Sequence, residues 1–160
     1  MGEPWSDHRL RYPTLAEPPG SCPLQIVLVR SNRRPLAMVK LTFCLRRRPD
    51  LTVAEFSRYW GEVHAPLVEA RGSILGIRRY VQVRTVDASS LHKALQHRNG
   101  GAPEPFDGIA ELWFDDMDAF VAARHPEAQT AAIELLEDER RFIDLPNSPM
   151  WLGEERVILG

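Results

Sequence analysis

The chain has 160 residues, a length typical of one domain, and its 44% hydrophobic and 26% charged residues suit a globular protein. A net charge of −2 argues against the basic surface of a nucleic-acid-binding protein, and no apolar run approaches the roughly 20 residues that span a bilayer. We therefore expect neither nucleic acid nor membrane as a partner. Cys22 and Cys44 form neither a disulfide framework nor a zinc-binding pattern, which favours a cytoplasmic protein.

The first 37 residues differ in composition from the rest of the chain. They contain six of the 13 prolines, and stretches such as "AEPPGSCP" are typical of loops. We predict a mostly disordered extension over residues 1–37, with at most a short strand near residues 26–29, followed by a domain over residues 38–160. Two interpretations stay open: the extension is a flexible arm, or Met38 is the natural start.

The domain begins with a predicted strand and a predicted helix. Apolar and polar side chains alternate in "MVKLTFCL", residues 38–45, which indicates a half-buried strand. Thr52 and Glu55 have the spacing of a capping box, so a helix should begin there. The apolar residues that follow recur at α-helical spacing and predict one buried stripe: Phe56, Trp60, Val63 and Leu67.

Pro66 interrupts this helix within the stretch "YWGEVHAPLV". Proline has no backbone N–H, and its ring clashes with the carbonyl group of Glu62, four residues earlier. We therefore expect the helix to kink or end near residues 62–65, which would place His64 at a helix terminus. His64 then has two interpretations: a satisfied core or rim residue, or a group that moves protons at a cavity.

Three more strands and a second helical region follow. We predict strands over residues 77–86, 107–114 and 151–159, and a loop with at most one helical turn over residues 87–106. Asp115 should cap a helix that restarts after His125 and runs to about Phe142. The order β-α-β-β-α-β predicts an α+β, ferredoxin-like fold, a four-stranded antiparallel sheet with helices on one face. The bare face should pack against a second subunit.

Alternation within the strands divides their side chains between two faces. We expect the more apolar set to pack on the helices; it comprises Val81, Val83, Ala110, Leu112 and Phe114. The mixed set should face a cavity or a partner subunit; it comprises Tyr80, Gln82, Glu111 and Trp113.

Glu111 and the histidines are the main candidates for chemistry. A carboxylate is costly to bury alone, so Glu111 is either an acid or base in a pocket or the partner of a nearby cation: Lys40, Arg78 or Arg84. His92 and His97 lack a third metal ligand, so we propose no metal site. The chain also carries no glycine-rich phosphate loop and no dinucleotide fingerprint.

Four stretches, spanning about residues 38–158, resemble the EthD-type domain: "MVKLTFCLRRRPDLTVAEFSRYWGEVHAPLV", "GIRRYVQ", "PFDGIAELWFDDMDAF" and "RFIDLPNSPMWLGEE". The resemblance implies a dimeric α+β barrel, in which two ferredoxin-like subunits pack their sheets together. It also makes His64 and Asp107 the counterparts of the family's histidine and of its "FDG" aspartate. Relatives in this superfamily include cofactor-free polyketide cyclases, quinol-forming monooxygenases, fungal polyketide dehydratases and haem proteins, whose proximal histidine has no match here.

Together these features predict a homodimeric enzyme without a cofactor, often labelled an oxidoreductase in this family, that binds a hydrophobic or aromatic small molecule between sheet and helices. His64 would move a proton, and Asp107 or Glu111 would orient it or the substrate. The expected walls are Trp60, Tyr80, Trp113 and Phe142. The reaction would be a dehydration, a cyclisation or an oxygen insertion into a carbanion. Two alternatives stay open: an accessory protein that binds a hydrophobic intermediate or supports a neighbouring oxygenase in catabolism, or a dimer with a filled interior.

Overall fold

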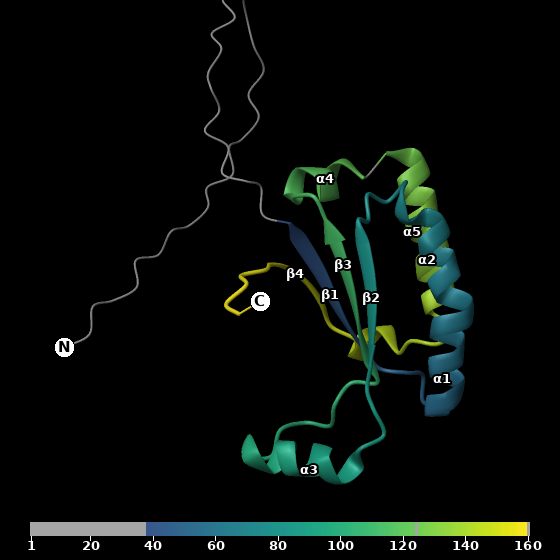
Figure 1. Cartoon of the computed structure of the whole chain (residues 1–160). Coiled ribbons are helices and arrows are strands. Elements are labelled where there is room, and N and C mark those ends of the chain that lie inside the picture. The colour runs from purple at the N-terminus through teal and green to yellow at the C-terminus, as the bar shows by residue number, and fades with distance from the viewer. Residues whose placement is uncertain (1–37, 124, 160) are drawn as a thin grey trace, which may run out of the picture. The chain divides into compact units, whose positions relative to one another are not determined.

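A four-stranded antiparallel sheet forms the centre of the domain (Figure 1). The computed structural model describes residues 38–123 and 125–159, so the N-terminal extension and the strand expected near residues 26–29 lie outside the described residues. The strands are β1 (Val39–Leu45), β2 (Arg79–Arg84), β3 (Gly108–Phe114) and β4 (Met150–Glu154). Their order across the sheet is β2-β3-β1-β4, which is the order of a ferredoxin-like fold.

Helices cover one face of this sheet. Helix α1 (Val53–Tyr59) continues through a π-helical turn (Trp60–His64) into α2 (Ala65–Gly72), and α5 (Pro126–Glu139) lies on the same side (Figure 1). The short helix α4 (Met117–Ala122) lies near one end of the strands. The predicted α+β class, with its βαββαβ order and its helices on one face, is thus confirmed.

Helix α1 begins where the capping box predicts. Thr52 Oγ1 accepts a hydrogen bond from the Glu55 backbone N–H at 3.2 Å, and Glu55 Oε2 accepts one from the Thr52 backbone N–H at 2.8 Å. Two backbone donors that have no partner within the helix are thereby satisfied. The first turn then directs Phe56 into the core, where it is fully buried.

Of the two outcomes expected near residues 62–65, a kink or an end, the end is wrong, because the helix continues past Pro66. The backbone instead widens into a single π-helical turn, in which the Ala65 N–H donates to the carbonyl oxygen of Trp60, five residues earlier. Pro66 then stands in the first turn of α2, where its missing N–H costs little. His64 consequently lies within a continuous helical segment and is only 4% exposed, rather than at an open terminus.

The π-helical turn also changes which residues face the core. It contains one residue more than an α-helical turn, so each buried position after it comes one residue later than the α-helical spacing predicts. His64 is buried in place of Val63, which is 49% exposed, and Val68 is buried in place of Leu67, which is half-buried. The predicted stripe is therefore correct at Phe56 and Trp60 and wrong beyond them.

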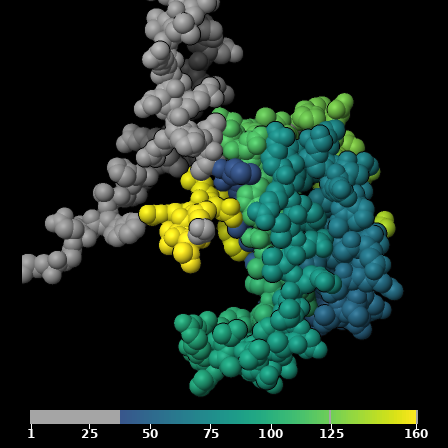
Figure 2. Space-filling view, viewed as in Figure 1, coloured from purple at the N-terminus to yellow at the C-terminus, as the bar shows by residue number. Residues whose placement is uncertain are grey.

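The segment between β2 and β3 contains more helix than the sequence predicts. Helix α3 (Ser89–Arg98) occupies half of the expected loop and projects from one end of the sheet (Figure 1, Figure 2). None of its ten described residues is buried, and no side-chain hydrogen bond caps its start. Because it has neither a capping signal nor a buried apolar stripe, the sequence pattern does not reveal it.

Two further boundaries differ from the prediction. Asp116, rather than Asp115, caps α4. Strand β4 ends at Glu154, whereas the sequence predicted a strand to residue 159. Among the described strands β4 pairs only with β1, and Glu154 already lies opposite Val39, the first residue of β1. His125 caps the start of α5, as the sequence indicates.

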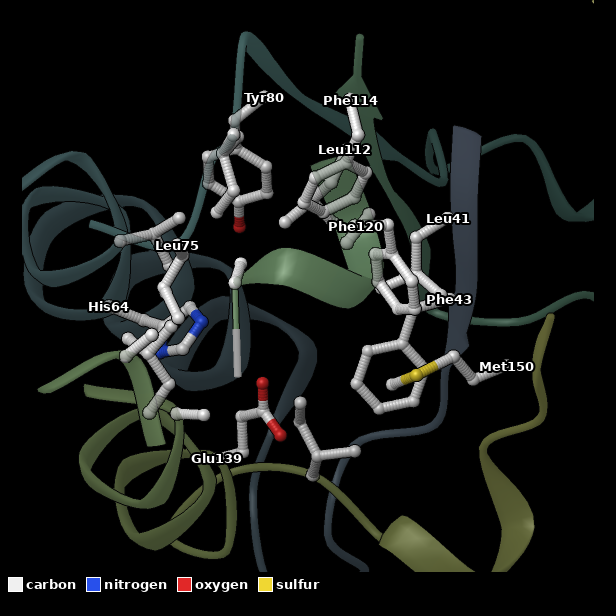
Figure 3. A pocket seen from close by; sticks show the side chains of 18 of the residues that line it. Leu41, Phe43, His64, Leu75, Tyr80, Leu112, Phe114, Phe120, Glu139 and Met150 are labelled. Carbon is white, nitrogen blue, oxygen red and sulfur yellow. The ribbon is translucent and has the colours of Figure 1, made fainter. Parts of the chain in front are cut away.

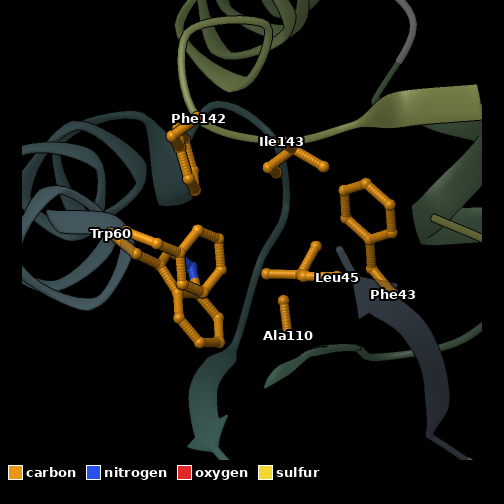
Figure 4. Close-up of a cluster of buried hydrophobic side chains, with 7 residues drawn as sticks. Phe43, Leu45, Trp60, Ala110, Phe142 and Ile143 are labelled. Carbon is orange, nitrogen blue, oxygen red and sulfur yellow. The ribbon is translucent and has the colours of Figure 1, made fainter. Parts of the chain in front are cut away.

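The core between sheet and helices is built around Trp60 (Figure 4). Its ring centroid lies 5.6 Å from that of Phe56. The indole also approaches β3 so closely that a Cβ atom added to Gly108 would lie 2.5 Å from its Cζ3 atom, a contact that only glycine permits. The other buried members of this cluster are Phe43, Leu45, Ala110, Phe142 and Ile143.

Candidate functional site

A cavity of about 330 Å³ lies between the sheet and the helices (Figure 3). This volume is at the lower end of the range of small-molecule sites. Most of its wall is apolar and comes from strands and helices alike, as in Leu41, Phe43, Leu75, Leu112, Phe114 and Phe120. Polar side chains are the minority of its wall, and they include His64, Tyr80 and Glu139. Such a lining favours a hydrophobic or aromatic ligand.

His64 borders the cavity and is held from behind by Asp138 of α5. Its Nδ1 atom lies 2.9 Å from Asp138 Oδ2, and the Tyr59 hydroxyl donates to Asp138 Oδ1 at 2.7 Å. Because a carboxylate only accepts hydrogen bonds, Nδ1 carries the proton, which leaves a lone pair on Nε2. Nε2 is thus the ring nitrogen available to a ligand.

The same burial sets the charge of this imidazole. Burial lowers the pKa of His64 below its usual value of 6.5, and the hydrogen bond and charge of Asp138 oppose this only in part. The ring is therefore neutral at neutral pH. A neutral imidazole, oriented by a carboxylate and open at Nε2, has the arrangement of a general base.

Glu139 is the second titratable group of the cavity. It follows Asp138 on α5 and extends its carboxyl group into the interior of the cavity (Figure 3). Burial, together with the neighbouring charge of Asp138, raises the pKa of Glu139 to about 7. Near neutral pH this group therefore exchanges between an acid and a base, which suits a proton carrier.

Replacing Glu139 with Gln should stabilise the fold, and the gain should depend on pH. The pKa of Glu139 is raised from 4.5 to about 7 on folding, so its contribution is favourable below pH 4.5 and is lost as the pH rises through 7. Glutamine does not ionise, and we expect Glu139→Gln to add about 1–3 kcal/mol to the free energy of unfolding near pH 8 and far less near pH 5. Urea unfolding at both pH values measures this.

The matched control for that experiment is Glu137→Gln. Glu137 stands on the same helix but is exposed, and it pairs with Arg140 across the surface. Surface pairs contribute little, so this variant should change stability by less than about 0.5 kcal/mol at either pH. Equal effects of the two substitutions, or a larger gain for Glu139→Gln near pH 5, would contradict the assigned environment of Glu139.

Trp60 and Tyr80 form another part of the wall, and Gln82 is hydrogen-bonded to both from outside the lining. The Trp60 Nε1–H donates to the Tyr80 hydroxyl oxygen at 3.0 Å, and the Gln82 amide Nε2 donates to the same oxygen at 2.9 Å. Gln82 Nε2 also donates to the Trp60 backbone carbonyl oxygen at 3.0 Å. These bonds fix β2 against the π-helical turn and hold the Tyr80 hydroxyl at the cavity (Figure 3).

The position of Tyr80 and Gln82 corrects the predicted faces of β2. Both face the helices, because the register pairs Tyr80 with Leu112 and places Val81 opposite Glu111. Val81 and Val83 accordingly lie on the open face, opposite to the expectation. A shift of one residue exchanges the two faces of a strand, and "RYVQVR" carries a mixed pattern on both, so its alternation does not decide between them.

Glu111 and Trp113 lie on the open face of the sheet, away from this cavity. Glu111 Oε1 accepts a hydrogen bond from Lys40 Nζ at 2.8 Å, so the predicted pairing with Lys40 is confirmed. Trp113 Nε1 donates to Glu155 Oε2 at 2.9 Å. The expectation that Trp113 is a wall of a site between sheet and helices is therefore wrong, because its position in β3 alternates with the helix-facing Leu112.

Asp107 and Phe142 support the structure around the site without bordering the cavity. Asp107 Oδ2 accepts from the Arg47 backbone N–H at 2.9 Å, and Oδ1 pairs with the Arg47 guanidinium. These bonds join the segment after β1 to the start of β3. Phe142 is fully buried, with its ring centroid 5.0 Å from that of His64. It fixes the imidazole by packing.

Asp138 and Glu139 are the site residues that the sequence analysis missed. They lie in the highly charged stretch "EDERR", which is typical of a solvent-exposed helix face. A signal was nevertheless present: Asp138 follows Ala128, Ala131 and Leu135 at the spacing of one helix face, and that face is turned inward. An acidic residue in line with an apolar helix face thus indicates a buried carboxylate.

Residues 38–123 and 125–159 offer neither a metal-binding cluster nor a membrane-spanning helix. These residues contain no cluster of three or more histidine, cysteine, aspartate or glutamate side chains arranged to bind a metal ion. None of the helices in this range is long and apolar enough to cross a membrane.

Comparisons with known proteins find one matching family model and several similar solved structures. A family model described as the EthD domain matches residues 48–146. An EthD-family protein from Bacillus halodurans C-125 is 25% identical, with a TM-score of 0.49, over 74% of this chain and 99% of that one. An EthD-like protein from Ralstonia eutropha JMP134 is 19% identical, with a TM-score of 0.53, over 78% and 96%. SnoaB, a cofactor-independent oxygenase from Streptomyces nogalater, is 18% identical, with a TM-score of 0.46, over 77% and 97%.

The matched region includes the central part of the cavity. It runs from the turn before α1 to the segment before β4, and so contains His64, Tyr80, Asp138 and Glu139. The likeness to the Ralstonia protein shows the same fold. Because the family model covers more than half of the chain, this protein belongs to the EthD domain family.

Proposed function

We propose that this EthD-domain protein is a small enzyme that moves a proton on a hydrophobic or aromatic substrate, without a cofactor. One observation carries the proposal: Asp138 holds Nδ1 of a buried, neutral His64, which leaves Nε2 as a base beside a mostly apolar cavity. A buried imidazole N–H needs an acceptor in any role, and here the acceptor is a carboxylate that the Tyr59 hydroxyl itself holds, an arrangement that fixes one tautomer of the ring.

The roles follow from the positions of the groups. His64 Nε2 removes a proton from a carbon atom of the substrate, and Asp138 is a positioning residue that keeps the ring in the productive tautomer. Glu139, with a pKa of about 7, returns a proton to the product. Dehydration, cyclisation and oxygen insertion can all begin with a carbanion formed in this way. An oxidoreductase activity would follow where molecular oxygen captures that carbanion.

Exchange of carbon-bound hydrogen tests this shared first step without knowledge of the natural substrate. The probe is 2-tetralone, a bicyclic aromatic ketone with acidic hydrogens beside its carbonyl group. In D₂O near neutral pH, the protein should accelerate the loss of the C1 proton signal in the NMR spectrum above the buffer rate, in proportion to protein concentration. The concentration dependence separates catalysis at the site from general buffer catalysis.

The second candidate function is ligand binding without chemistry. The largely apolar wall of the cavity favours it, since such a wall holds a hydrophobic molecule whether or not a reaction follows. Saturable binding of 2-tetralone with no acceleration of exchange would overturn the enzymatic proposal in favour of a binding or accessory protein.

We also propose that two copies of the chain pack through the open faces of their sheets. Support comes from large apolar side chains on that face, of which Val83 is 46% and Trp151 is 50% exposed. Sedimentation should find a particle of about 36 kDa, twice the 18.2 kDa of the chain, and Trp151→Glu should dissociate it. A wild-type monomer at micromolar concentration would contradict this proposal.

A further inference from the structure

The hydroxyl group of Tyr80 accepts two hydrogen bonds within the protein. A phenolic oxygen has two lone pairs that accept and one hydrogen that donates. Both acceptor positions are occupied, by the Trp60 Nε1–H at 3.0 Å and by the Gln82 amide at 2.9 Å. The orientation of that amide is fixed, because its Nε2 also donates to the Trp60 carbonyl oxygen, which can only accept. The Tyr80 hydrogen must therefore point elsewhere.

The free direction is the interior of the cavity. Tyr80 borders the cavity, and Figure 3 shows its hydroxyl oxygen directed inward, above the His64 ring. No acceptor for this hydrogen is found among residues 38–123 and 125–159. Burial, and more weakly the charge of Glu139, raises the pKa of Tyr80 above its usual value, and the hydrogen bonds from Gln82 and Trp60 oppose this only in part, so the group keeps its hydrogen at neutral pH.

We propose that the cavity takes ligands that carry a carbonyl oxygen, and that this oxygen accepts a hydrogen bond from the Tyr80 hydroxyl while the adjacent C–H group lies toward His64. The inference rests on the proposed function and specifies its substrate class. The geometry favours this class because a preorganised donor and a preorganised base border one apolar space.

His64 and Tyr80 are sufficient for the formation of an enolate from such a ligand. His64 Nε2 takes the proton of the C–H bond, and the electron pair of that bond forms the C=C bond of an enolate as the carbonyl π pair moves onto oxygen. The Tyr80 hydrogen bond strengthens as this oxygen becomes negative, so it stabilises the enolate more than the ketone. In D₂O the imidazolium exchanges its proton for a solvent deuteron, and delivery of a deuteron to carbon, from the imidazolium or from Glu139, gives the labelled ketone of the exchange reaction described above.

A pair of probes with nearly the same shape tests the recognition of oxygen. We would titrate 2-tetralone and tetralin, its hydrocarbon analogue, and follow binding by the fluorescence of the tryptophans and by calorimetry. Water solvates the ketone better, so an apolar cavity without a donor would favour tetralin. We expect the wild type to bind 2-tetralone at least as tightly as tetralin. Tyr80→Phe should weaken the binding of 2-tetralone by about tenfold and leave the binding of tetralin unchanged.

Two further variants keep the test valid if Tyr80→Phe folds poorly. Gln82→Met removes one of the two donors that fix the Tyr80 hydroxyl. It should weaken the binding of 2-tetralone by a smaller factor than Tyr80→Phe does, and leave the binding of tetralin unchanged. Tyr59→Phe also deletes a phenolic hydroxyl, but one that donates to Asp138, so it should leave the preference for the ketone unchanged. The wild-type comparison of the two probes requires no variant.

The outcomes separate this inference from the proposed function. A wild type that binds tetralin more tightly than 2-tetralone overturns the inference, as does a Tyr80→Phe variant that weakens the binding of both probes equally. Failure of both probes to bind overturns it too. A preference for the ketone that depends on Tyr80, without accelerated exchange, supports the inference and refutes the enzymatic proposal.

Discussion

Replacing His64 with Gln should lower the protein-dependent exchange rate of 2-tetralone by roughly 10²–10⁴-fold, the usual contribution of a positioned general base. Glutamine is neutral and similar in length, and its amide can still donate to Asp138, so the fold should be retained. The loss should appear in the rate of exchange at saturation and not in the affinity for 2-tetralone, because the apolar wall binds the ring system.

Asp138→Asn should produce a loss of similar size by a different route. An amide can donate to Nδ1, which favours the tautomer with the proton on Nε2 and removes the base from the cavity. Because the two residues act as one unit, the double variant should be no slower than His64→Gln alone. The matched control is His97→Gln on α3, an exposed histidine far from the cavity wall, which should exchange at the wild-type rate. Wild-type exchange in His64→Gln would show that another group is the base.

Trp60→Ala should destabilise the domain by about 3–5 kcal/mol, the cost of deleting a large aromatic side chain from a tight core. Trp60 is 1% exposed, and it supports both the close contact with Gly108 and the hydrogen bond to Tyr80. Since domains of this size are stable by only about 5–15 kcal/mol, the variant should be partly unfolded at physiological temperature. The midpoint of urea unfolding gives the measurement.

Val63→Ala provides the comparison on the same helix. The α-helical spacing placed Val63 in the buried stripe, but the structure leaves it 49% exposed. We therefore expect a change of less than about 0.5 kcal/mol, as for other surface positions. A cost above about 2 kcal/mol for Val63→Ala would show that the buried stripe has α-helical spacing and no π-helical turn.

The fold was predictable from the sequence because its main signals are local. The alternation in β1 and the capping box at Thr52 each depend on a few neighbouring residues, and the structure retains both. The faces of β2 were not predictable in this way, since they depend on which residue of β3 lies opposite Tyr80. Helix α3 was missed because little in its sequence distinguishes an exposed helix from a loop.

The candidate site was predictable only in part. His64 was identified and Tyr80 was named as a ligand contact, and the structure places both at one cavity. Asp138 and Glu139 are 74 and 75 positions away from His64 along the chain, and only the packing of α5 against the π-helical turn brings them close. From the sequence, Asp107 or Glu111 was expected to orient the histidine or the substrate, but their carboxylates pair with Arg47 and Lys40 outside the cavity.

The π-helical turn has a consequence for comparing this chain with its relatives. If one of the residues between Trp60 and His64 were absent, His64 would follow Phe56 by seven positions and Val68 would follow it by eleven. These are the spacings of one face of a regular α-helix. The wide turn thus absorbs an insertion of one residue while α2 keeps its orientation toward the sheet. A relative that is one residue shorter here would hold its histidine at the same place in space, so an alignment needs a gap before the histidine to match equivalent groups.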